Sequence, residues 1–531
     1  MMVPKYEVRA MASLVQLIDD HGWRHGDSLA CAVGPDQRSY GALAEQILRL
    51  ASALRELGLQ PGDRLALYLP NSVEYVICFY GAMRAGLVAT PINGAFTSAE
   101  VSYLLSDSGA AGIVSTPALL DRIGTGSEGA EGPSPRVVVS TGESTPPWCS
   151  LTELLTATAG SLPYPGDDAP ACLPYSSGTT GRSKGIVHTH DSMAMQAVLS
   201  ANRLQLRRDD VLVHAMPLVH LYPGNILMGG LFVAGAAMVV QPAFDPPGFA
   251  GLLSQWHATA CGGVPTTYAM LCQLSRDHLA SLDFSQLAVA FSAGAPLAGS
   301  IRSGFRDLFG ADVLDCYGIT EAAGNLVANL RYGDRPELSC GVPYPLTDVR
   351  IVDPLDNDVP DGEVGELIAR GPQIMTGYWN RPEATAETLR GGYLHTGDLA
   401  RRDQRGFYFI VDRKNDLILT GGYNVYPAEV EDVLQAHPDV AMCAVFGIPD
   451  EIKGEKPWAA VVPRAGAQVD EADLDAHCRK QLAAYKVPRR FLVVDELPRS
   501  SVGKILRREL RATFTPVPTP AGDPPTPEES L

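Results

Sequence analysis

The stretch Tyr175-Ser-Ser-Gly-Thr-Thr-Gly-Arg-Ser-Lys-Gly185 decides how the rest of the chain is interpreted. Its three glycines allow the backbone to turn sharply and to bring N–H groups close to a polyphosphate. Its serine and threonine hydroxyls offer further donors, and Lys184 adds a point charge for phosphate oxygens. The spacing differs from the Walker A pattern G-x-x-x-x-G-K-[ST]. The stretch favours a phosphate-binding loop, and an ordinary polar loop is the alternative.

The sequence around this loop alternates between strand-like and helix-like segments. An apolar run at residues 64–70 is followed by a helix-length segment at 71–86 and by a second apolar run at 88–93. The same order recurs at residues 235–263. Strand–helix–strand alternation is typical of parallel sheets covered by helices. We therefore expect an α/β fold with a large N-terminal domain built on mostly parallel sheets.

The pattern of the sequence changes beyond about residue 345. Short β-like runs with Gly and Asp at the bends, such as DVRIVDP and GFYFIVDR, predict a small β-rich subdomain. After Asp412 the pattern becomes α+β. We predict a large N-terminal domain at residues 1–412 and a small C-terminal α+β domain at 413–514. Six prolines in residues 515–531 predict an extended or disordered tail.

Composition and charge narrow the classes of function. The chain has 531 residues, of which 46% are hydrophobic and 19% charged, as in ordinary globular proteins. Its formal net charge is −18, which argues against a broad face for nucleic acid or an anionic membrane. The uncharged stretch at residues 221–244 is interrupted by Pro and Gly. It predicts a buried helix followed by a buried strand, not a transmembrane segment.

Cysteine and histidine give no sign of a metal or disulfide framework. The ten cysteines form no CxxC pair and are scattered along the chain, so we expect reduced, mostly buried thiols in a cytoplasmic protein. The N-terminus lacks the pattern of a signal peptide. His188 and His190 have the spacing of a metal pair. Two histidines two residues apart on a strand usually do not share a face with a third ligand, so we reject a zinc site there.

Eight further motifs follow the loop in order and, together with it, carry a family resemblance. They are Pro217-Leu-Val-His220, Ser292-Ala-Gly-Ala-Pro-Leu297, Tyr317-Gly-Ile-Thr-Glu321, Arg370-Gly-Pro to Gly377-Tyr378, Leu394-His-Thr-Gly-Asp398, Asp412-Arg413, Gly421-Gly-Tyr-Asn-Val-Tyr-Pro427 and Pro498-Arg-Ser-Ser-Val-Gly-Lys504. Together the motifs resemble the adenylate-forming superfamily of acyl-CoA synthetases, firefly luciferase and peptide-synthetase adenylation domains. The resemblance is strongest to acyl-CoA ligases. Departures are Ser183 for the usual Pro, Val219 for an aromatic residue and Asn415 for Lys or Asp.

The resemblance implies a reaction in two steps, with ATP, Mg²⁺ and coenzyme A taking part. A carboxylate attacks the α-phosphate of ATP and releases pyrophosphate, and a thiol then displaces AMP from the acyl adenylate. Lys504 is implied to bridge the carboxylate and the α-phosphate, and Thr320 to donate to that phosphate. Glu321 is implied to bind Mg²⁺, which prefers oxygen ligands. His220 is implied to lie between the acyl pocket and the pantetheine tunnel.

The resemblance also implies the residues that bind the nucleotide and coenzyme A. Tyr317 offers an aromatic face to adenine, Asp398 accepts from the ribose hydroxyls, and the small mobile domain rotates near Asn415 between the two steps. The full set is Ser176, Ser177, Gly178, Thr179, Thr180, Gly181, Lys184, Gly294, Ala295, Asp315, Tyr317, Asp398, Arg413, Gly421 and Gly422.

The predicted acid pocket is uncharged. Its residues are His220, Leu221, Tyr222, Asn225, Val264, Tyr268, Ser292, Gly318 and Ala322. Residues 220–228 contain no acid to hold an α-ammonium group, which argues against amino acids. A second carboxylate would need a buried cation, and the corresponding segments contain none. A fatty or aromatic monocarboxylic acid is therefore favoured.

The acceptor of the acyl group stays open at this point. Coenzyme A is the favoured acceptor, and an acyl carrier protein or another nucleophile of a biosynthetic pathway is the alternative. A luciferase-type oxidation and a non-catalytic interaction protein are less favoured, the latter because Lys184, Glu321, Asp398, Arg413 and Lys504 are all present. We expect no nucleic-acid partner and leave a homodimer open.

Overall fold

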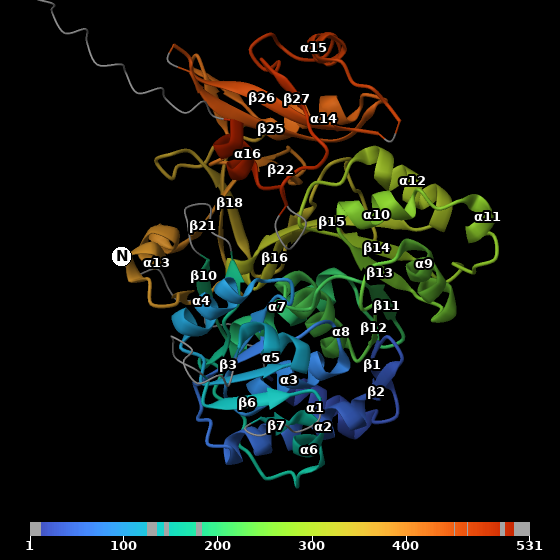
Figure 1. The fold of residues 1–531 in the computed structure, drawn as a ribbon, viewed down its shortest axis with the longest axis vertical. Coiled ribbons are helices and arrows are strands. Elements are labelled where there is room, and N and C mark those ends of the chain that lie inside the picture. The colour runs from blue at the N-terminus through green and yellow to red at the C-terminus, as the bar shows by residue number, and fades with distance from the viewer. Residues whose placement is uncertain are drawn as a thin grey trace, which may run out of the picture. The chain divides into compact units, whose positions relative to one another are not determined.

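The computed structural model describes residues 12–124, 135–142, 148–176, 183–450, 452–464, 466–499 and 505–514. The chain divides into two compact units, Met1–Ile410 and Val411–Leu531, which are described separately. Figure 1 labels many of the elements of both. The predicted tail at residues 515–531 lies outside the described residues.

Two nine-stranded sheets form the framework of the first unit. The first has the order β17-β16-β15-β14-β13-β11-β12-β1-β2, and its strands from β15 to β1 pair in parallel. In that order the strands are β17 (Val342–Pro343), β16 (Gly324–Ala328), β15 (Asp312–Ile319), β14 (Val289–Ser292), β13 (Ala260–Gly263), β11 (Val211–His214), β12 (Ala237–Val240), β1 (Leu29–Val33) and β2 (Asp36–Ser39).

The second sheet has the order β20-β10-β8-β4-β3-β5-β6-β7, with β9 paired to β10. Its strands from β8 to β7 are parallel, whereas β10 runs antiparallel to β8, β9 and β20. The strands are β20 (Gly377–Tyr378), β10 (Lys184–Thr189), β9 (Tyr175–Ser176), β8 (Pro170–Cys172), β4 (Val88–Ile92), β3 (Arg64–Tyr68), β5 (Gly112–Ser115), β6 (Val137–Ser140) and β7 (Cys149–Ser150).

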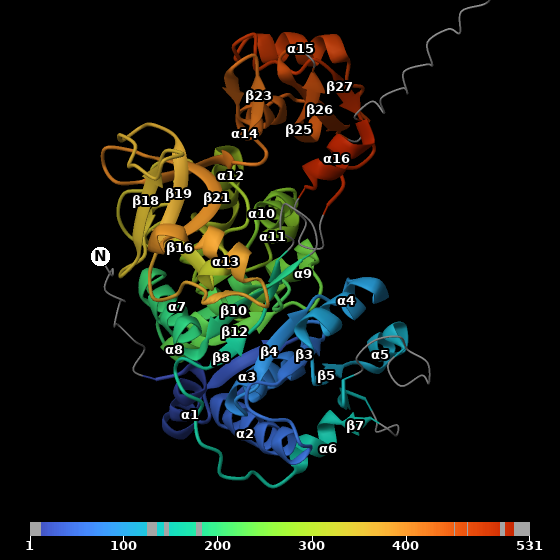
Figure 2. The ribbon, with the colours of Figure 1, turned by 90° about the vertical axis from the view of Figure 1, so that its left-hand side faces the viewer.

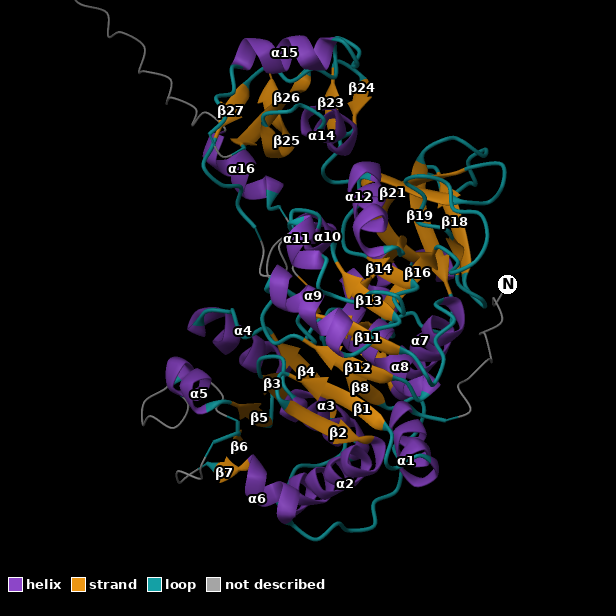
Figure 3. Ribbon diagram, turned by 90° about the vertical axis from the view of Figure 1, so that its right-hand side faces the viewer, coloured by secondary structure: helices purple, strands orange, loops and turns teal. Residues whose placement is uncertain are grey.

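Helices fill the space between the two sheets and cover their outer faces (Figures 2 and 3). The inner layer is α1 (Leu14–Arg24), α2 (Tyr40–Glu56), α3 (Val73–Arg84), α7 (His190–Arg203) and α8 (Met228–Ala234). The outer layer on the first sheet is α9 (Pro246–Gln255), α10 (Pro265–Leu271) and α12 (Gly299–Phe309), and that on the second is α4 (Ser98–Ser108) and α5 (Pro117–Ile123). Two short helices, α6 (Leu151–Thr156) and α11 (Arg276–Leu279), belong to the same unit.

The side chains of a strand point alternately to the two faces of its sheet, and this explains why helices cover both faces. In β3, Leu65 and Leu67 join the core between the sheets, whereas Ala66 and Tyr68 join the core beneath α4 and α5. Successive side chains of a strand point to opposite faces, so apolar residues at every position require helices on both sides. The expected α/β class of the large N-terminal domain is confirmed.

The predicted β-rich subdomain forms a third sheet in the order β18-β19-β21-β22. Its strands are β18 (Asp348–Val352), β19 (Gly365–Arg370), β21 (Leu394–Arg402) and β22 (Tyr408–Arg413), with α13 (Pro382–Thr388) and the 3₁₀ turn η3 (Arg390–Gly392) in the connections. β22 leads from the first unit into the second.

The second unit is α+β, as the sequence predicts. Its five-stranded sheet contains β24 (Tyr423–Val425), β23 (Ile418–Thr420), β26 (Gly454–Pro463), β25 (Val440–Asp450) and β27 (Phe491–Val493). One face packs on α14 (Pro427–Gln435) and α15 (Glu471–Arg479) through Cys443 and Val445 of β25. The other face packs on α16 (Arg507–Phe514) through Ala444 and Phe446. Figure 2 shows α15 lying along this sheet.

The segment at residues 221–244 contains the predicted buried helix and strand. A π-helical turn, η1 (Tyr222–Leu227), precedes α8, and β12 follows. Across the part of the chain that the structure describes, no helix combines the length and the apolar character needed to cross a membrane. All ten cysteines are free thiols, and eight are buried.

Candidate active site

The candidate site is built at one edge of the first sheet. Because β13, β14 and β15 are parallel, Gly263 and Ser292, the last residues of β13 and β14, lie side by side with Asp315 of β15. Val264 follows β13 directly, and Gly294 and Ala295 follow β14. Ligands of open parallel sheets bind in the crevice outside the carboxyl ends of the strands. This register therefore gathers predicted nucleotide and acid residues from distant parts of the sequence.

The phosphate loop joins two paired strands of the second sheet. Ser176 of β9 lies opposite Lys184 of β10, so the hairpin holds the two ends of the loop together. The Tyr103 hydroxyl donates to the Ser183 carbonyl at 2.8 Å and connects the end of the loop to α4. The predicted residues Ser177, Gly178, Thr179, Thr180 and Gly181 lie outside the described residues.

Thr320 and Glu321 begin a 3₁₀ turn, η2 (Thr320–Ala322), directly after β15. The buried His188 donates from Nε2 to the Thr320 carbonyl at 2.7 Å. Burial lowers the pKa of His188 to about 4, so the ring is neutral near pH 7. The Met375 N–H donates to the Glu321 carbonyl at 2.8 Å. These two contacts fix the turn that presents the Glu321 carboxylate, an oxygen donor of the kind that Mg²⁺ prefers.

Tyr378 contacts both an acid and a cation of the candidate site. Its hydroxyl donates to Glu321 Oε1 at 2.9 Å, and Lys184 Nζ lies 5.0 Å from the centre of its ring. The structure therefore links the predicted phosphate lysine and the predicted magnesium carboxylate through one phenol. Tyr378 lies within one of the family motifs, but no role for it was predicted from the sequence.

Tyr317 and Asp398 meet between the first and third sheets. The Tyr317 hydroxyl donates to Asp398 Oδ2 at 2.7 Å, and both side chains are buried. Asp315 is also buried, and this raises the pKa of its carboxyl to about 7 despite the opposing charge of Arg302. The predicted adenine and ribose residues thus lie on one strand, β15, and its neighbour in space, β21.

His220 has a neighbour, Asn93, that was not predicted from the sequence. Asn93 Nδ2 lies 3.4 Å from His220 Nε2, while Asn93 Oδ1 accepts from the Ala95 N–H at 2.9 Å. The second bond fixes the orientation of the amide, so Nε2 of His220 accepts and Nδ1 carries the proton. Burial lowers the pKa of His220 to about 4. Asn93 directly follows β4, at the carboxyl end of a parallel strand, which is the one signal that could have found it.

The predicted acid-binding residues separate into two groups. Leu221 precedes the π-helical turn and Tyr222 and Asn225 lie on it, and Asn225 Nδ2 donates to the carbonyl of Ala323, the residue after Ala322, at 3.1 Å. Gly318 faces the Gly324 carbonyl so closely that an added Cβ would lie 2.0 Å from that oxygen. Tyr268 instead lies in the core with its ring 5.1 Å from that of Phe305. Its part in acid binding stays a prediction.

Two tyrosines share one acceptor behind the site. The hydroxyls of Tyr222 and Tyr268 both donate to the Phe291 carbonyl, at 3.0 and 2.6 Å. Since Phe291 precedes Ser292 in β14, these bonds fix the strand end next to the predicted adenine residues.

The predicted residues of the second unit lie near its first strands. Asp412 Oδ1 accepts from the Arg413 N–H at 2.7 Å, and Oδ2 accepts from the Ala428 N–H in the first turn of α14 at 2.9 Å. Gly421 and Gly422 join β23 to β24 with φ of 57° and 84°, a region that favours glycine. Lys504 lies outside the described residues.

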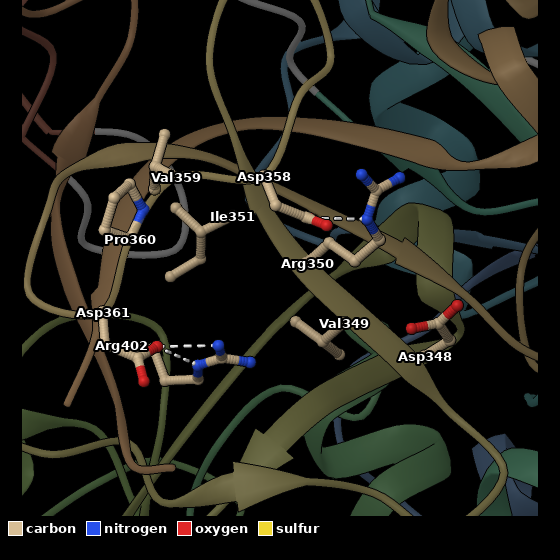
Figure 4. A pocket seen from close by; sticks show the side chains of 9 residues that line it. All are labelled: Asp348, Val349, Arg350, Ile351, Asp358, Val359, Pro360, Asp361 and Arg402. Carbon is tan, nitrogen blue, oxygen red and sulfur yellow. Dashed lines mark hydrogen bonds and ion pairs between the residues drawn. The ribbon is translucent and has the colours of Figure 1, made fainter. Parts of the chain in front are cut away.

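A separate hollow of about 350 Å³ lies in the third sheet (Figure 4). Both arginines of its lining are paired: Arg350 Nε donates to Asp358 Oδ1, and Arg402 Nε donates to Asp361 Oδ1, each at 2.7 Å. None of the predicted site residues lines it. We assign no ligand to this hollow.

Two family models match the chain. The model of the AMP-binding enzyme matches residues 18–379, and that of the AMP-binding enzyme C-terminal domain matches residues 429–504. A feruloyl-CoA synthase of Amycolatopsis sp is 36% identical over 477 residues, which cover 90% of this chain and 94% of the relative. A long-chain-fatty-acid–CoA ligase of Yersinia pestis is 35% identical and covers 94% of both chains.

Solved structures resemble most of the chain. ATP-bound MatB from Rhodopseudomonas palustris superposes with a TM-score of 0.86 and 33% identity, covering 94% of this chain and 99% of that one. The anthranilate CoA ligase AuaEII in complex with anthranoyl-AMP superposes with a TM-score of 0.87 and 27% identity, covering 95% and 97%.

Proposed function

The chain belongs to the AMP-binding enzyme family, and from this premise we propose that its candidate site activates a fatty or aromatic monocarboxylic acid. The protein is an ATP-dependent, AMP-forming acid–thiol ligase that uses ATP, Mg²⁺ and coenzyme A. The observation that carries the assignment to this site is the cluster at the end of β15, where Lys184, Glu321 and Tyr378 meet and Tyr317 contacts Asp398.

The first step forms an acyl adenylate. A carboxylate oxygen bonds to the α-phosphorus of ATP while the bond from that phosphorus to pyrophosphate breaks. Lys184 and the phosphate loop bind the phosphates, Thr320 donates to the α-phosphate, and Asp398 accepts from the ribose hydroxyls. Glu321 would hold magnesium, which would supply positive charge against the phosphates. The small domain delivers Lys504, which bridges the two reacting groups.

The second step transfers the acyl group to sulfur. The thiol of coenzyme A bonds to the acyl carbon, the carbon–oxygen bond to the phosphate breaks, and AMP leaves with that oxygen. Gly421 and Gly422 line the thiol tunnel after the small domain, which begins after Asp412, has rotated about Asn415. A neutral His220, held by Asn93, separates the acyl pocket from that tunnel without adding a charge.

The proposed class of acid rests on the uncharged residues of the predicted acid pocket. Residues 220–228, 264–271 and 322–325 carry no charged side chain, and Ile226 and Leu227 of the π-helical turn are fully buried. A second carboxylate or an α-ammonium group would lose its hydration there without a counter-charge, at a cost of several kcal/mol. Both named relatives act on acids with a large apolar part, a feruloyl and a long-chain fatty acyl group, which supports the proposal.

A panel of acids tests the proposal. The purified protein is mixed with ATP, Mg²⁺ and coenzyme A and one acid at a time: ferulate, benzoate, octanoate, palmitate, malonate or phenylalanine. Pyrophosphate and acyl-CoA are measured together. We expect acyl-CoA from aromatic or fatty monocarboxylates ahead of malonate and phenylalanine. Faster turnover of malonate or phenylalanine would overturn the assignment of the pocket.

Three further points belong to the same proposal. Coenzyme A is the preferred acceptor, and faster transfer to a phosphopantetheinyl carrier protein in the same assay would replace it. We place the protein in the cytoplasm, which cell fractionation tests. Analytical ultracentrifugation tests whether the protein forms a homodimer.

A further inference from the structure

Tyr378 is held in place more firmly than its two-residue strand suggests. Its backbone pairs with Ile186 of β10, the strand that begins with Lys184, and its N–H donates to Thr385 Oγ1 at 2.9 Å. The preceding Gly377 has φ of 155°, and an added Cβ would lie 2.6 Å from Thr385. These contacts therefore fix the backbone position from which the Tyr378 side chain extends.

The side chain of Tyr378 contacts the acid Glu321 and the cation Lys184. Its hydroxyl donates to Glu321 Oε1 at 2.9 Å, and its ring faces Lys184 Nζ at 5.0 Å from the ring centre. Burial and the charge of Glu321 raise the pKa of Tyr378, so the group remains a phenol that donates. A carboxylate oxygen has more than one acceptor position, so the bond from Tyr378 leaves Glu321 able to bind a metal ion.

The segment that contains Tyr378 makes a second contact with Glu321, through its backbone. The Met375 N–H donates to the Glu321 carbonyl at 2.8 Å, three residues before Tyr378. Residues 375–378 thus hold both the backbone and the carboxylate of Glu321. A carboxylate on a short turn would otherwise explore several rotamers, each with different access to a metal ion.

We propose that Tyr378 is a positioning residue for adenylation, whose hydroxyl orients Glu321 toward magnesium and whose ring steers Lys184 toward phosphate. The proposal rests on the proposed function, in which Glu321 binds the magnesium ion that accompanies ATP. Tyr378 touches neither reacting atom, so its effect is expected in the magnesium dependence and not in the binding of the acid.

The test compares Tyr378→Phe with a matched control, Tyr393→Phe. The Tyr393 hydroxyl also donates to a carboxylate, Asp348 Oδ2, at 2.6 Å, and its ring also faces cations, Arg350 and Arg370. Both changes remove one hydroxyl and keep the ring. A hydrogen bond to a charged group contributes about 1.5–3 kcal/mol, which corresponds to a roughly 10- to 150-fold effect.

Two readouts are measured for each variant. Calorimetry records the binding of the α,β-methylene analogue of ATP with and without MgCl₂, and pyrophosphate release gives the magnesium concentration for half-maximal adenylation. For Tyr378→Phe we expect the magnesium-dependent gain in analogue affinity to fall at least tenfold and the magnesium requirement to rise by a similar factor. The KM for the acid and the conversion of supplied acyl adenylate to thioester should match those of the wild type and of Tyr393→Phe.

Further variants separate positioning from folding. Tyr378→Leu should in addition weaken binding of the analogue without magnesium, because the ring beside Lys184 is lost. In a Glu321→Gln background, Tyr378→Phe should add little to the magnesium requirement, since both changes act through one carboxylate. Equal magnesium dependence of Tyr378→Phe and Tyr393→Phe would overturn the proposal, as would a fall in the unfolding midpoint of Tyr378→Phe without a change in magnesium dependence. A wild-type protein that releases no pyrophosphate with any acid would instead refute the proposed function.

Discussion

Asp315 shows how a single residue of the site acquires unusual chemistry. It lies on β15, opposite Ser292 of the parallel strand β14, and its carboxyl is buried. Burial penalises the ionised form more than the nearby Arg302 stabilises it, so the pKa rises from 3.8 to about 7. A carboxyl with this pKa changes charge within the physiological range of pH. Its titration therefore affects the stability of the unliganded protein.

The Asp315→Asn variant tests this charge. Because the folded pKa exceeds the unfolded one, the folded state binds more protons between about pH 4 and 7, and wild-type stability falls as pH rises through that window. The amide is neutral throughout. Urea unfolding of the apo proteins should give equal stability near pH 4 and a more stable variant at pH 8. The difference has an upper limit of about 4 kcal/mol, at ~1.4 kcal/mol per pKa unit. A difference that does not change with pH would contradict the assignment.

At the scale of elements, the strands and amphipathic helices follow from the sequence because their burial is periodic. The run at residues 64–70 forms β3, and the following segment forms α3. The π-helical turn Tyr222–Leu227 could not be predicted, because its apolar residues suit an α-helix equally well. The contacts of Tyr378 and Asn93 were also missed. They join segments that are far apart in the sequence, and periodicity within one segment carries no information on such pairs.

Gly324 tests how tightly the π-helical turn packs against β16. Its φ is 136°, and an added Cβ would lie 2.2 Å from Ile226 Cδ1. Gly324→Ala should lower the free energy of unfolding by about 1–3 kcal/mol through strain and overpacking. Gly251→Ala is the control, because a Cβ on this helical glycine meets no atom within 4 Å. It should be neutral or stabilising by about 0.5–1 kcal/mol. Equal urea midpoints for the two variants would contradict this prediction, because they would show that Ile226 makes room for the added Cβ without loss of stability.

At the scale of the whole molecule, the proposed machinery is divided between two compact units. Strands β9 and β10, which flank the phosphate loop, belong to the first unit together with Glu321 and Asp398. Gly421, Gly422 and Lys504 belong to the second. The motifs of both units were found in the sequence, because each is short and local. The proposed approach of Lys504 to the phosphates involves residues of both units, and the rotation near Asn415 is implied by the family resemblance, not by a pattern of the residues.

The division predicts that the two half-reactions can be separated by mutation. Lys504→Ala should remove a cation that acts only in adenylation, at a cost of roughly 3–4 kcal/mol in the barrier. It should convert a supplied acyl adenylate to thioester at a near-normal rate. A bulky residue at Gly422, where φ is 84°, should show the reverse. Equal losses in both half-reactions for a folded Lys504→Ala variant would contradict this division of labour.

The path of one oxygen atom tests the central claim, that the acid is activated through an acyl adenylate. A good acid substrate is labelled with ¹⁸O at both carboxylate oxygens and converted with ATP and coenzyme A. Attack of the carboxylate on the α-phosphorus, followed by thiol attack on the acyl carbon, leaves one carboxylate oxygen on AMP. Mass spectrometry should therefore find one ¹⁸O in each AMP formed, and one in each thioester. Unlabelled AMP, with the ¹⁸O in inorganic phosphate or pyrophosphate, would contradict the account.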